Sequence, residues 1–181
     1  MPRFVALLRG VNVGKGNRLP MAALRKLLES LGYGQVETLL NSGNAVFSST
    51  ARSGERVAQT IHQALDAALE LRVLVIVKSA REFDTIVQDN VLASGCGDAS
   101  RLLVVFAQDP ATLRDLGHLS RMTRDPEKFH TGASAAYLHC PAGILQSEAA
   151  KALLGKGGRS VTTRNWATVQ KLHALATRST N

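Results

Sequence analysis

Hydrophobic and polar positions along this chain switch between two periods, and their order predicts the secondary structure. Residues 4–8 (FVALL) form a short apolar run typical of a strand. After Pro20, which suits a first helical position, apolar residues recur at three- and four-residue spacing up to Gly32, which indicates a helix. The runs VETLL (36–40) and AVFSS (45–49) flank the turn NSGN and predict a hairpin.

A second helix and a fourth strand complete the first half of the pattern. The helix is expected to place these apolar residues on one face: Val57, Ile61, Ala64, Leu65, Ala68 and Leu69. The strand is RVLVIVKS (72–79). Strand–helix–strand–strand–helix–strand is the order of a ferredoxin-like unit.

The second half follows the same order without repeating the sequence. After a helix in SAREFDTIVQDN we expect a strand at 101–107, a helix capped by Asp109, a hairpin from KFHT and AAYLHC, a short helix, a short strand and a terminal helix. The sequence therefore predicts an α+β protein with two ferredoxin-like subdomains, residues 1–79 and 80–181, the second ending in a C-terminal helix.

Two predicted strands, VLVIV and LLVVF, are apolar at every position, and therefore on both of the faces to which alternate residues point. A strand with one exposed face alternates apolar and polar residues, so we expect both sheets to be covered on both faces, by helices and by each other. This pattern argues against an RNA-recognition module, whose open sheet face carries aromatic residues.

Composition narrows the class of protein further. The apolar share is 45%, as in globular proteins, and no apolar stretch reaches the roughly 20 residues that span a bilayer. The N-terminal segment lacks the pattern of a signal peptide. Cys96 and Cys140 have neither disulfide-framework nor zinc-site spacing. We expect a cytoplasmic protein with reduced thiols and no membrane partner.

The net charge of +8 is concentrated at the two ends of the sequence. Residues 1–50 carry six Lys or Arg and two Glu, and residues 151–181 carry six Lys or Arg and no acid. If the ends meet, they form a basic face that attracts phosphates or another polyanion. The alternative is a soluble surface whose charge has no specific partner.

The stretch LLRGVNVGKGNRLPMAAL (7–24) has the outline of a phosphate-binding loop but fits neither established motif. A Walker A loop needs four residues between its first Gly and the Gly-Lys pair and then Ser or Thr, whereas only three residues separate Gly10 from Gly14 and Gly16 follows Lys15. The chain also lacks the dinucleotide-binding fingerprint GxGxxG, because Gly14-Lys15-Gly16 is followed by Asn17, Arg18 and Leu19. What remains is a glycine-rich turn that either holds an anion or supplies positive φ angles.

Two other stretches are ordinary when each is considered alone. NSGN (41–44) is an adequate hairpin turn. TTRNWATVQKL (162–172) is consistent with a helix capped by Asn165, with Trp166 in the core and a solvated Arg164.

Together, the three stretches LRGVNVGKGNRLPM, SGNAVFSS and TTRNWATVQKL resemble the signature segments of the domain of unknown function 1697 family. Those segments read approximately R-G-(I/V)-N-V-G-G-K-N, S-G-N-V-x-F and T-x-R-N-W-N-T, and YLHCPAGILQSEAAKAL is similar to a further family stretch. This chain departs from them in the displaced Lys15, in Leu39 for a frequent Tyr, and in Ala167 for the second Asn. The resemblance implies two ferredoxin-like subdomains and no biochemical function.

If the three motifs converge, their polar residues form one candidate site. Its members are Arg9, Asn12, Lys15, Asn17, Arg18, Ser42, Asn44, Arg164, Asn165 and Trp166. The set contains no Asp, Glu, His or Cys, the residue types that acid–base catalysis and metal ligation normally need, so we expect no metal and no cofactor. Arg, Lys, Asn and Ser suit recognition of an oxyanion, and Trp166 can stack on a ring.

The cysteines and histidines are weaker candidates. Cys96, in the loop SGCGD, has no base or helix N-terminus near it in sequence, so we expect an inert thiol. His139 and Cys140 are neighbours on a predicted strand and should point to opposite faces.

Three functional hypotheses follow. The first is binding of an anionic or phosphorylated small ligand, nucleotide-like in class, at the carboxylate-free site. The second is nucleic-acid binding through the basic ends. The third is an enzyme that acts on an anionic metabolite. The sequence does not specify an oligomeric state.

Overall fold

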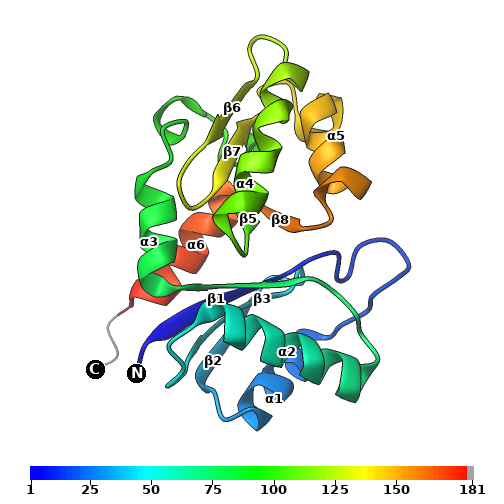
Figure 1. The fold of residues 1–181 in the computed structure, drawn as a ribbon, viewed down its shortest axis with the longest axis vertical. Helices are drawn as coiled ribbons and strands as arrows, with labels where there is room; N and C mark the ends of the chain where they lie inside the picture. Colours follow the sequence, from blue (N-terminus) through cyan, green and yellow to red (C-terminus); the bar gives the residue numbers. More distant parts are fainter. Residues whose placement is uncertain (179–181) are drawn as a thin grey trace. The chain divides into compact units, whose positions relative to one another are not determined.

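A computed structural model describes residues 1–178 of the protein (Figure 1). Its contacts divide the chain into two compact units. The first contains residues 1–83 together with the C-terminal part from Leu172, and the second contains residues 84–171. Each unit is organised around its own four-stranded sheet.

The sheet of the first unit has the order β2-β3-β1-β4. Its strands are β1 (Arg3–Leu8), β2 (Gly34–Leu39), β3 (Asn44–Ser48) and β4 (Val75–Ser79). All neighbours are antiparallel, and Val5 at the centre of β1 lies opposite Val46 on one side and Lys78 on the other. Because β3 lies between β1 and β2, the unit is the split βαβ arrangement of a ferredoxin-like fold.

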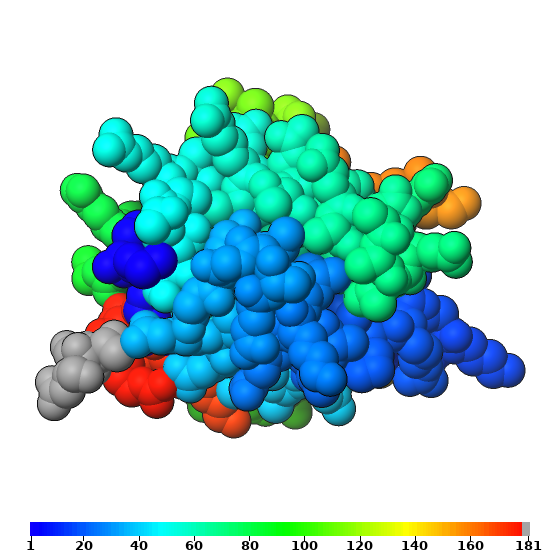
Figure 2. Space-filling model, turned by 90° about the horizontal axis from the view of Figure 1, so that it is seen from below, coloured from blue at the N-terminus to red at the C-terminus, as the bar shows by residue number. Residues whose placement is uncertain are grey.

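Helices α1 (Met21–Ser30) and α2 (Gly54–Leu69) cover one face of this sheet (Figures 1 and 2). They pack Leu24, Leu28, Ile61 and Leu65 against Phe47 and its neighbours in a continuous apolar core. Pro20 stands one position before the helix, as its N-cap. Ser53 caps α2 by accepting a hydrogen bond from the backbone N–H of Arg56.

The predicted apolar face of α2 is wrong at its C-terminal end. Ala68 and Leu69 are exposed, Leu69 to 42%. The helix ends at Glu70 in the left-handed conformation, and the chain turns back so that Leu71 and Val73 enter the core. The residues after the helix thus occupy the positions that helical periodicity assigned to its last turn.

The sheet of the second unit has the corresponding order, β6-β7-β5-β8, with antiparallel neighbours throughout. Its strands are β5 (Leu102–Ala107), β6 (Lys128–Thr131), β7 (Ala136–His139) and β8 (Val161–Asn165). Two helices pack on the face of Leu103, Val105 and Leu138: α4 (Pro110–Asp115), which continues as the 3-10 helix Leu116–Met122, and α5 (Glu148–Leu154). Asp109 caps α4 as predicted.

Two further helices, α3 (Ala80–Gln88) and α6 (Trp166–Thr177), were also predicted. The hydroxyl of Tyr137 on β7 donates to the backbone carbonyl of Ile86 on α3 at 2.7 Å, in the interior of the second unit. Helix α6 follows β8 directly and belongs to the first unit from Leu172 onward. Short 3-10 turns occupy Ala93–Gly95, Ala99–Arg101, Ile144–Gln146 and Lys156–Gly158.

Apolar residues at both parities of the central strands are buried, as the sequence predicted. All six residues of β5 are buried, and so are Val75, Ile76 and Val77 of β4. The protein is therefore an α+β fold built from two ferredoxin-like subdomains. Within residues 1–178, no helix combines the length and apolar character needed to cross a membrane.

Candidate functional site

The segment between β1 and α1, residues 9–19, forms a loop that extends beyond the end of β1 (Figures 1 and 2). Arg9, Lys15 and Arg18 give it three cations, and it contains no acidic residue. Lys15 and Arg18 are exposed, and neither makes a hydrogen bond or an ion pair within the described chain. Arg9 is half-buried, which lowers the pKa of its guanidinium.

Asn12 holds this loop together from inside. Its side-chain Nδ2 donates to the carbonyl oxygens of Leu19 at 2.8 Å and Asn41 at 2.7 Å, and its Oδ1 accepts from the N–H of Leu19 at 2.9 Å. Its backbone N–H donates to the carbonyl of Asn17 at 3.0 Å. Because both amide hydrogens and the oxygen are already engaged, Asn12 acts as an organiser of the loop and not as a ligand contact.

The turn 41–44 packs directly against the loop. Gly43 has a φ of +77°, and a Cβ placed on it would lie 2.6 Å from Val11 Cγ2 and 2.8 Å from Leu8 Cβ. Its carbonyl accepts from the N–H of Leu8 at 2.8 Å. Glycine is therefore required here both for its conformation and for the close approach of the loop.

Two further predicted polar residues, Asn44 and Asn17, also position backbone within the first unit. Asn44 is completely buried, and its Nδ2 donates to Leu39 O and to Ser42 Oγ, each at 2.9 Å. Asn17 is exposed, and its Nδ2 donates to Gly10 O at 3.3 Å. The structure thus joins the first two motifs into one element and directs the amides of these asparagines toward backbone carbonyls.

The backbone of the loop presents unused donors. The φ angle is positive at Gly10, Asn12 and Gly14 and negative at Val11 and Val13 between them. Alternating φ signs of this kind turn successive N–H groups toward one side, as in the backbone nests that bind anions. Among the residues described, no acceptor is found for the N–H groups of Gly14 and Lys15, whereas the turns at 11–12 and 14–15 direct the N–H groups of Val13 and Gly16 toward the carbonyls of Gly10 and Val13.

The third motif lies in the second unit. Arg164 on β8 is 8% exposed and donates to Thr162 Oγ1 at 2.9 Å and to Thr163 O at 2.7 Å, so the expectation of a solvated Arg164 is wrong. Burial lowers the pKa of its guanidinium to about 10. Asn165 Oδ1 accepts from Thr168 N at 2.9 Å, and Trp166 is buried, as expected for a capped helix with a core tryptophan. A site shared by all three motifs stays a prediction.

The basic residues at the two ends of the sequence are divided between the units. The first unit contains twelve Lys or Arg and six Asp or Glu, and the second contains ten and eight. Of the six cations in residues 151–181, only Arg178 belongs to the first unit, where it pairs with Glu37. Most of the net charge, +6 of +8, thus belongs to the unit that carries the loop.

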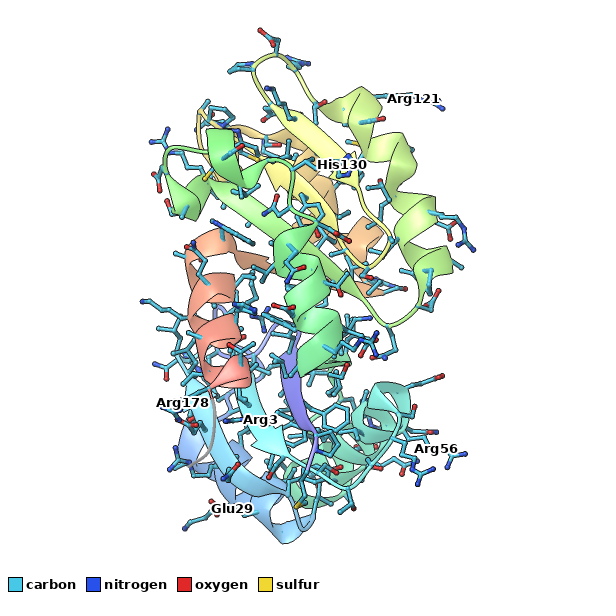
Figure 3. The ribbon with its side chains drawn as sticks, turned by 90° about the vertical axis from the view of Figure 1, so that its left-hand side faces the viewer. Arg3, Glu29, Arg56, Arg121, His130 and Arg178 are labelled. Atoms are coloured by element: carbon cyan, nitrogen blue, oxygen red, sulfur yellow. The ribbon has the colours of Figure 1, made fainter. Side chains whose placement is uncertain are left out.

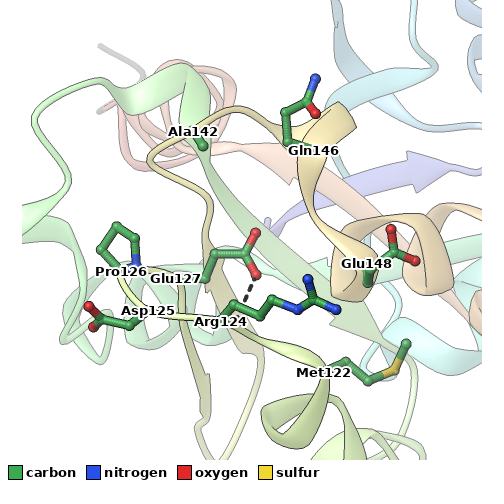
Figure 4. Close-up of a pocket in the computed structure, with 8 residues that line it drawn as sticks. All are labelled: Met122, Arg124, Asp125, Pro126, Glu127, Ala142, Gln146 and Glu148. Atoms are coloured by element: carbon green, nitrogen blue, oxygen red, sulfur yellow. Dashed lines mark hydrogen bonds between the residues drawn. The ribbon is translucent and has the colours of Figure 1, made fainter.

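A depression of about 260 Å³ in the second unit has a different character (Figure 4). Asp125, Glu127 and Glu148 line it with one arginine, Arg124, whose backbone N–H donates to Glu127 Oε2 at 3.3 Å. This acidic lining does not suit an anion. Within residues 1–178, no group of three or more His, Cys, Asp or Glu side chains is arranged to hold a metal ion.

Sequence reasoning missed one arrangement in the second unit. Cys96 showed no base near it in sequence, yet His139 Nε2 lies 3.1 Å from the carbonyl oxygen of Cys96, and both residues line one cavity. The two are 43 positions apart, so no local pattern links them.

Comparisons with known proteins extend the description of the fold. A family model described as "Protein of unknown function (DUF1697)" matches residues 1–137, which include the first two motifs. The solved structure of the conserved bacterial protein SP0830 from Streptococcus pneumoniae is similar over 97% of this chain and 98% of that chain, with a TM-score of 0.78 and 23% identity. At this identity the likeness concerns the fold alone. No match was found among the curated proteins.

Proposed function

The chain belongs to the DUF1697 family of proteins of unknown function, and from that premise we propose that it binds an anionic or phosphorylated small molecule, nucleotide-like in class, through the loop 9–19. The observation that carries the proposal is the short run of N–H groups at Gly14 and Lys15 without acceptors in the described chain. Lys15 lies within this run, and Arg18 follows it closely.

The chemistry of the loop supports an anion over a neutral ligand. Backbone N–H groups and cations both stabilise negative charge, and together they form the usual phosphate sites of glycine-rich loops. The guanidinium of Arg18 can bind a phosphate or carboxylate in bidentate geometry. The loop contains no Asp, Glu, His or Cys, so the proposal concerns binding and assigns no reaction. The proposal includes a cytoplasmic location. Thiols stay reduced in the cytoplasm, which is consistent with the two free cysteines.

The test compares two double variants that remove the same charge. Lys15→Gln with Arg18→Gln changes the loop, whereas Arg25→Gln with Lys26→Gln changes two exposed cations on α1 of the same unit. We expect the affinity for phosphate or a nucleotide, measured by calorimetry at low salt, to fall about tenfold or more in the first variant and little in the second. Equal affinities in the two variants, or no binding by the unmodified protein, would refute the proposal.

Nucleic-acid binding is a second candidate, favoured by the net charge of +6 on the first unit. Neutralised phosphates release counterions, so the logarithm of affinity should fall linearly with the logarithm of salt concentration, with a slope of about −0.9 per phosphate. If nucleic acid binds a delocalised basic surface, its affinity should fall by a similar factor in both double variants. Selective loss in the loop variant favours the small ligand, and comparable losses favour nucleic acid.

A further inference from the structure

Two exposed apolar side chains flank the hydrogen bond that joins the loop 9–19 to the β2–β3 turn. Val13, which follows Asn12, is 69% exposed, and Leu40, which precedes Asn41, is 52% exposed. Neither side chain contributes to the apolar core of the first unit. Accessible apolar surface therefore lies within the basic loop and on the turn bonded to it.

The backbone of Leu40 is in the left-handed region, with a φ of 57°. Steric contact of the Cβ disfavours this conformation for leucine, and glycine or asparagine is the usual residue there. Because the side chain is exposed, burial in the core does not compensate for this cost. Residues held in such conformations cluster at ligand-binding sites, and a leucine at this position suits contact with the apolar part of a ligand.

Asn41 presents a side-chain amide next to Leu40. Its backbone carbonyl accepts from Asn12 Nδ2, whereas its side chain is exposed and makes no hydrogen bond within residues 1–178. The amides of Asn12 and Asn44 on the same element donate to backbone carbonyls. A carboxamide offers a donor and an acceptor side by side, the pair with which asparagine binds the edge of a nucleobase. Of these three asparagines, Asn41 is the one whose side chain suits a ligand.

The donors for a phosphate begin one residue beyond Val13. The N–H groups of Gly14 and Lys15 have no acceptor among the residues described, and the side chain of Lys15 is exposed. Phosphate donors, apolar surface and a carboxamide thus occur on one element, held together by the Asn12–Asn41 bond. A nucleoside phosphate has the complementary features, which are a phosphate, the apolar faces of a ring and a polar ring edge. Inorganic phosphate or a sugar phosphate would use only the first.

We propose that the ligand of this element is a nucleoside phosphate whose phosphate binds the N–H groups of Gly14 and Lys15. The base lies against Leu40 and Val13, and Asn41 binds its polar edge through the carboxamide. Asn41, Leu40 and Val13 then determine specificity, because they contact the part of the ligand that distinguishes a nucleotide from other phosphates. This inference rests on the proposed anion binding and adds recognition of the base.

The test compares the common ribonucleoside 5′-monophosphates with ribose 5-phosphate, by calorimetry at low salt. All these probes carry the same phosphate group, so a difference in affinity reports the base. We expect at least one nucleotide to bind the unmodified protein about tenfold more tightly than ribose 5-phosphate. Equal affinities would overturn recognition of a base and leave anion binding in place. Absence of binding by every probe would refute both.

Three single variants identify the residues that contact the base. Leu40→Asn replaces the apolar side chain by one that tolerates left-handed backbone, and Val13→Thr exchanges a methyl group for a hydroxyl. Asn41→Ala removes the carboxamide but keeps the carbonyl that Asn12 binds.

Leu40→Asn and Asn41→Ala should each weaken nucleotide binding about threefold or more, and Val13→Thr about twofold, without changing the affinity for ribose 5-phosphate. Leu69→Asn, at the exposed end of α2, is the matched control and should change neither affinity. Thermal unfolding checks that each variant is folded. Equal losses for the nucleotide and ribose 5-phosphate, or no loss for the nucleotide, would overturn the assignment of these residues.

Discussion

The side-chain amide of Asn12 and the backbone carbonyl of Asn41 are joined by a 2.7 Å hydrogen bond across 29 positions of sequence. This bond, with the contact of Val11 on Gly43, connects the loop after β1 to the β2–β3 turn. Two stretches that each read as an ordinary turn are therefore one structural element. The conformation of the candidate anion loop depends on residues that are not themselves expected to touch the anion.

Replacing Asn12 by glycine should destabilise the first unit. Glycine tolerates the φ of 57° at this position, so the substitution removes the three side-chain hydrogen bonds without adding backbone strain. We expect the free energy of unfolding to fall by about 2–3 kcal/mol, measured by urea denaturation. Asn17→Gly is the matched control, since Asn17 also has positive φ but makes one 3.3 Å bond, and its loss should stay below about 1 kcal/mol.

Substituting alanine at Gly43 and at Gly14 separates packing from backbone strain. Both glycines have positive φ, +77° and +62°, and an added Cβ meets Val11 and Leu8 only at position 43. Gly14→Ala should cost about 1 kcal/mol for the left-handed conformation alone. Gly43→Ala should cost about 2–4 kcal/mol, because the loop must also move away from the turn. Similar losses in thermal or urea unfolding would show that the contact of loop and turn contributes little.

The sequence predicted the order of elements and the sheet topology because both depend on local patterns. Periodicity identified the strands and helices, and the ferredoxin-like order then followed from connection rules. Asp109 and Asn165 were correctly identified as caps, since capping is a local hydrogen bond. Leu69 was wrongly predicted to be buried, because its exposure depends on long-range packing. Only the complete fold determines that Leu71 occupies the core in its place.

The candidate site was less predictable because its details are long-range. Composition identified a basic, carboxylate-free loop. It did not show that the side-chain amides of Asn12 and Asn44 donate to backbone carbonyls. Burial of Arg164 was missed because an arginine on a short strand is usually exposed. The meeting of Cys96 with His139 required the loop after α3 to return to β7, which no motif encodes.

The stability of the first unit should depend on pH through Glu37. Its carboxylate pairs with Arg178 and with Arg3 at 3.3 Å, and Figure 3 shows both arginines in this unit. The hydrogen bond from Arg178 is the main cause that lowers the pKa of Glu37 below its ordinary 4.5. A lowered carboxyl pKa contributes stability that is present above the ordinary value and is lost as pH falls through the lowered one.

Glu37→Gln should therefore lower the free energy of unfolding by about 1 kcal/mol at pH 7, since the pair is partly exposed, and by progressively less below pH 4.5. Glu29→Gln on α1 is the control, because the exposed Glu29 makes no ion pair in the described chain (Figure 3). A Glu37→Gln effect that does not change with pH would contradict the assignment.

The two tyrosines of the protein allow a matched test of the interior of the second unit. Tyr137 is completely buried, and its hydroxyl donates to Ile86 O at 2.7 Å. Burial raises the pKa of this hydroxyl, so it stays a donor at physiological pH. Tyr137→Phe should lower the free energy of unfolding by about 1–2 kcal/mol, because a buried carbonyl loses its donor. Tyr33 stacks on Phe47 with ring centroids 4.6 Å apart, and its hydroxyl makes no hydrogen bond within residues 1–178.

Tyr33→Phe should therefore change the stability by less than about 0.5 kcal/mol. Hydrogen exchange should locate the effect of Tyr137→Phe, with faster exchange of the α3 amides and unchanged exchange in β1 and β3. Equal stability losses in the two variants would mean that the Tyr137–Ile86 bond does not fix α3 to its sheet. Faster exchange confined to α3 would identify this bond as the contact that holds the helix on β7.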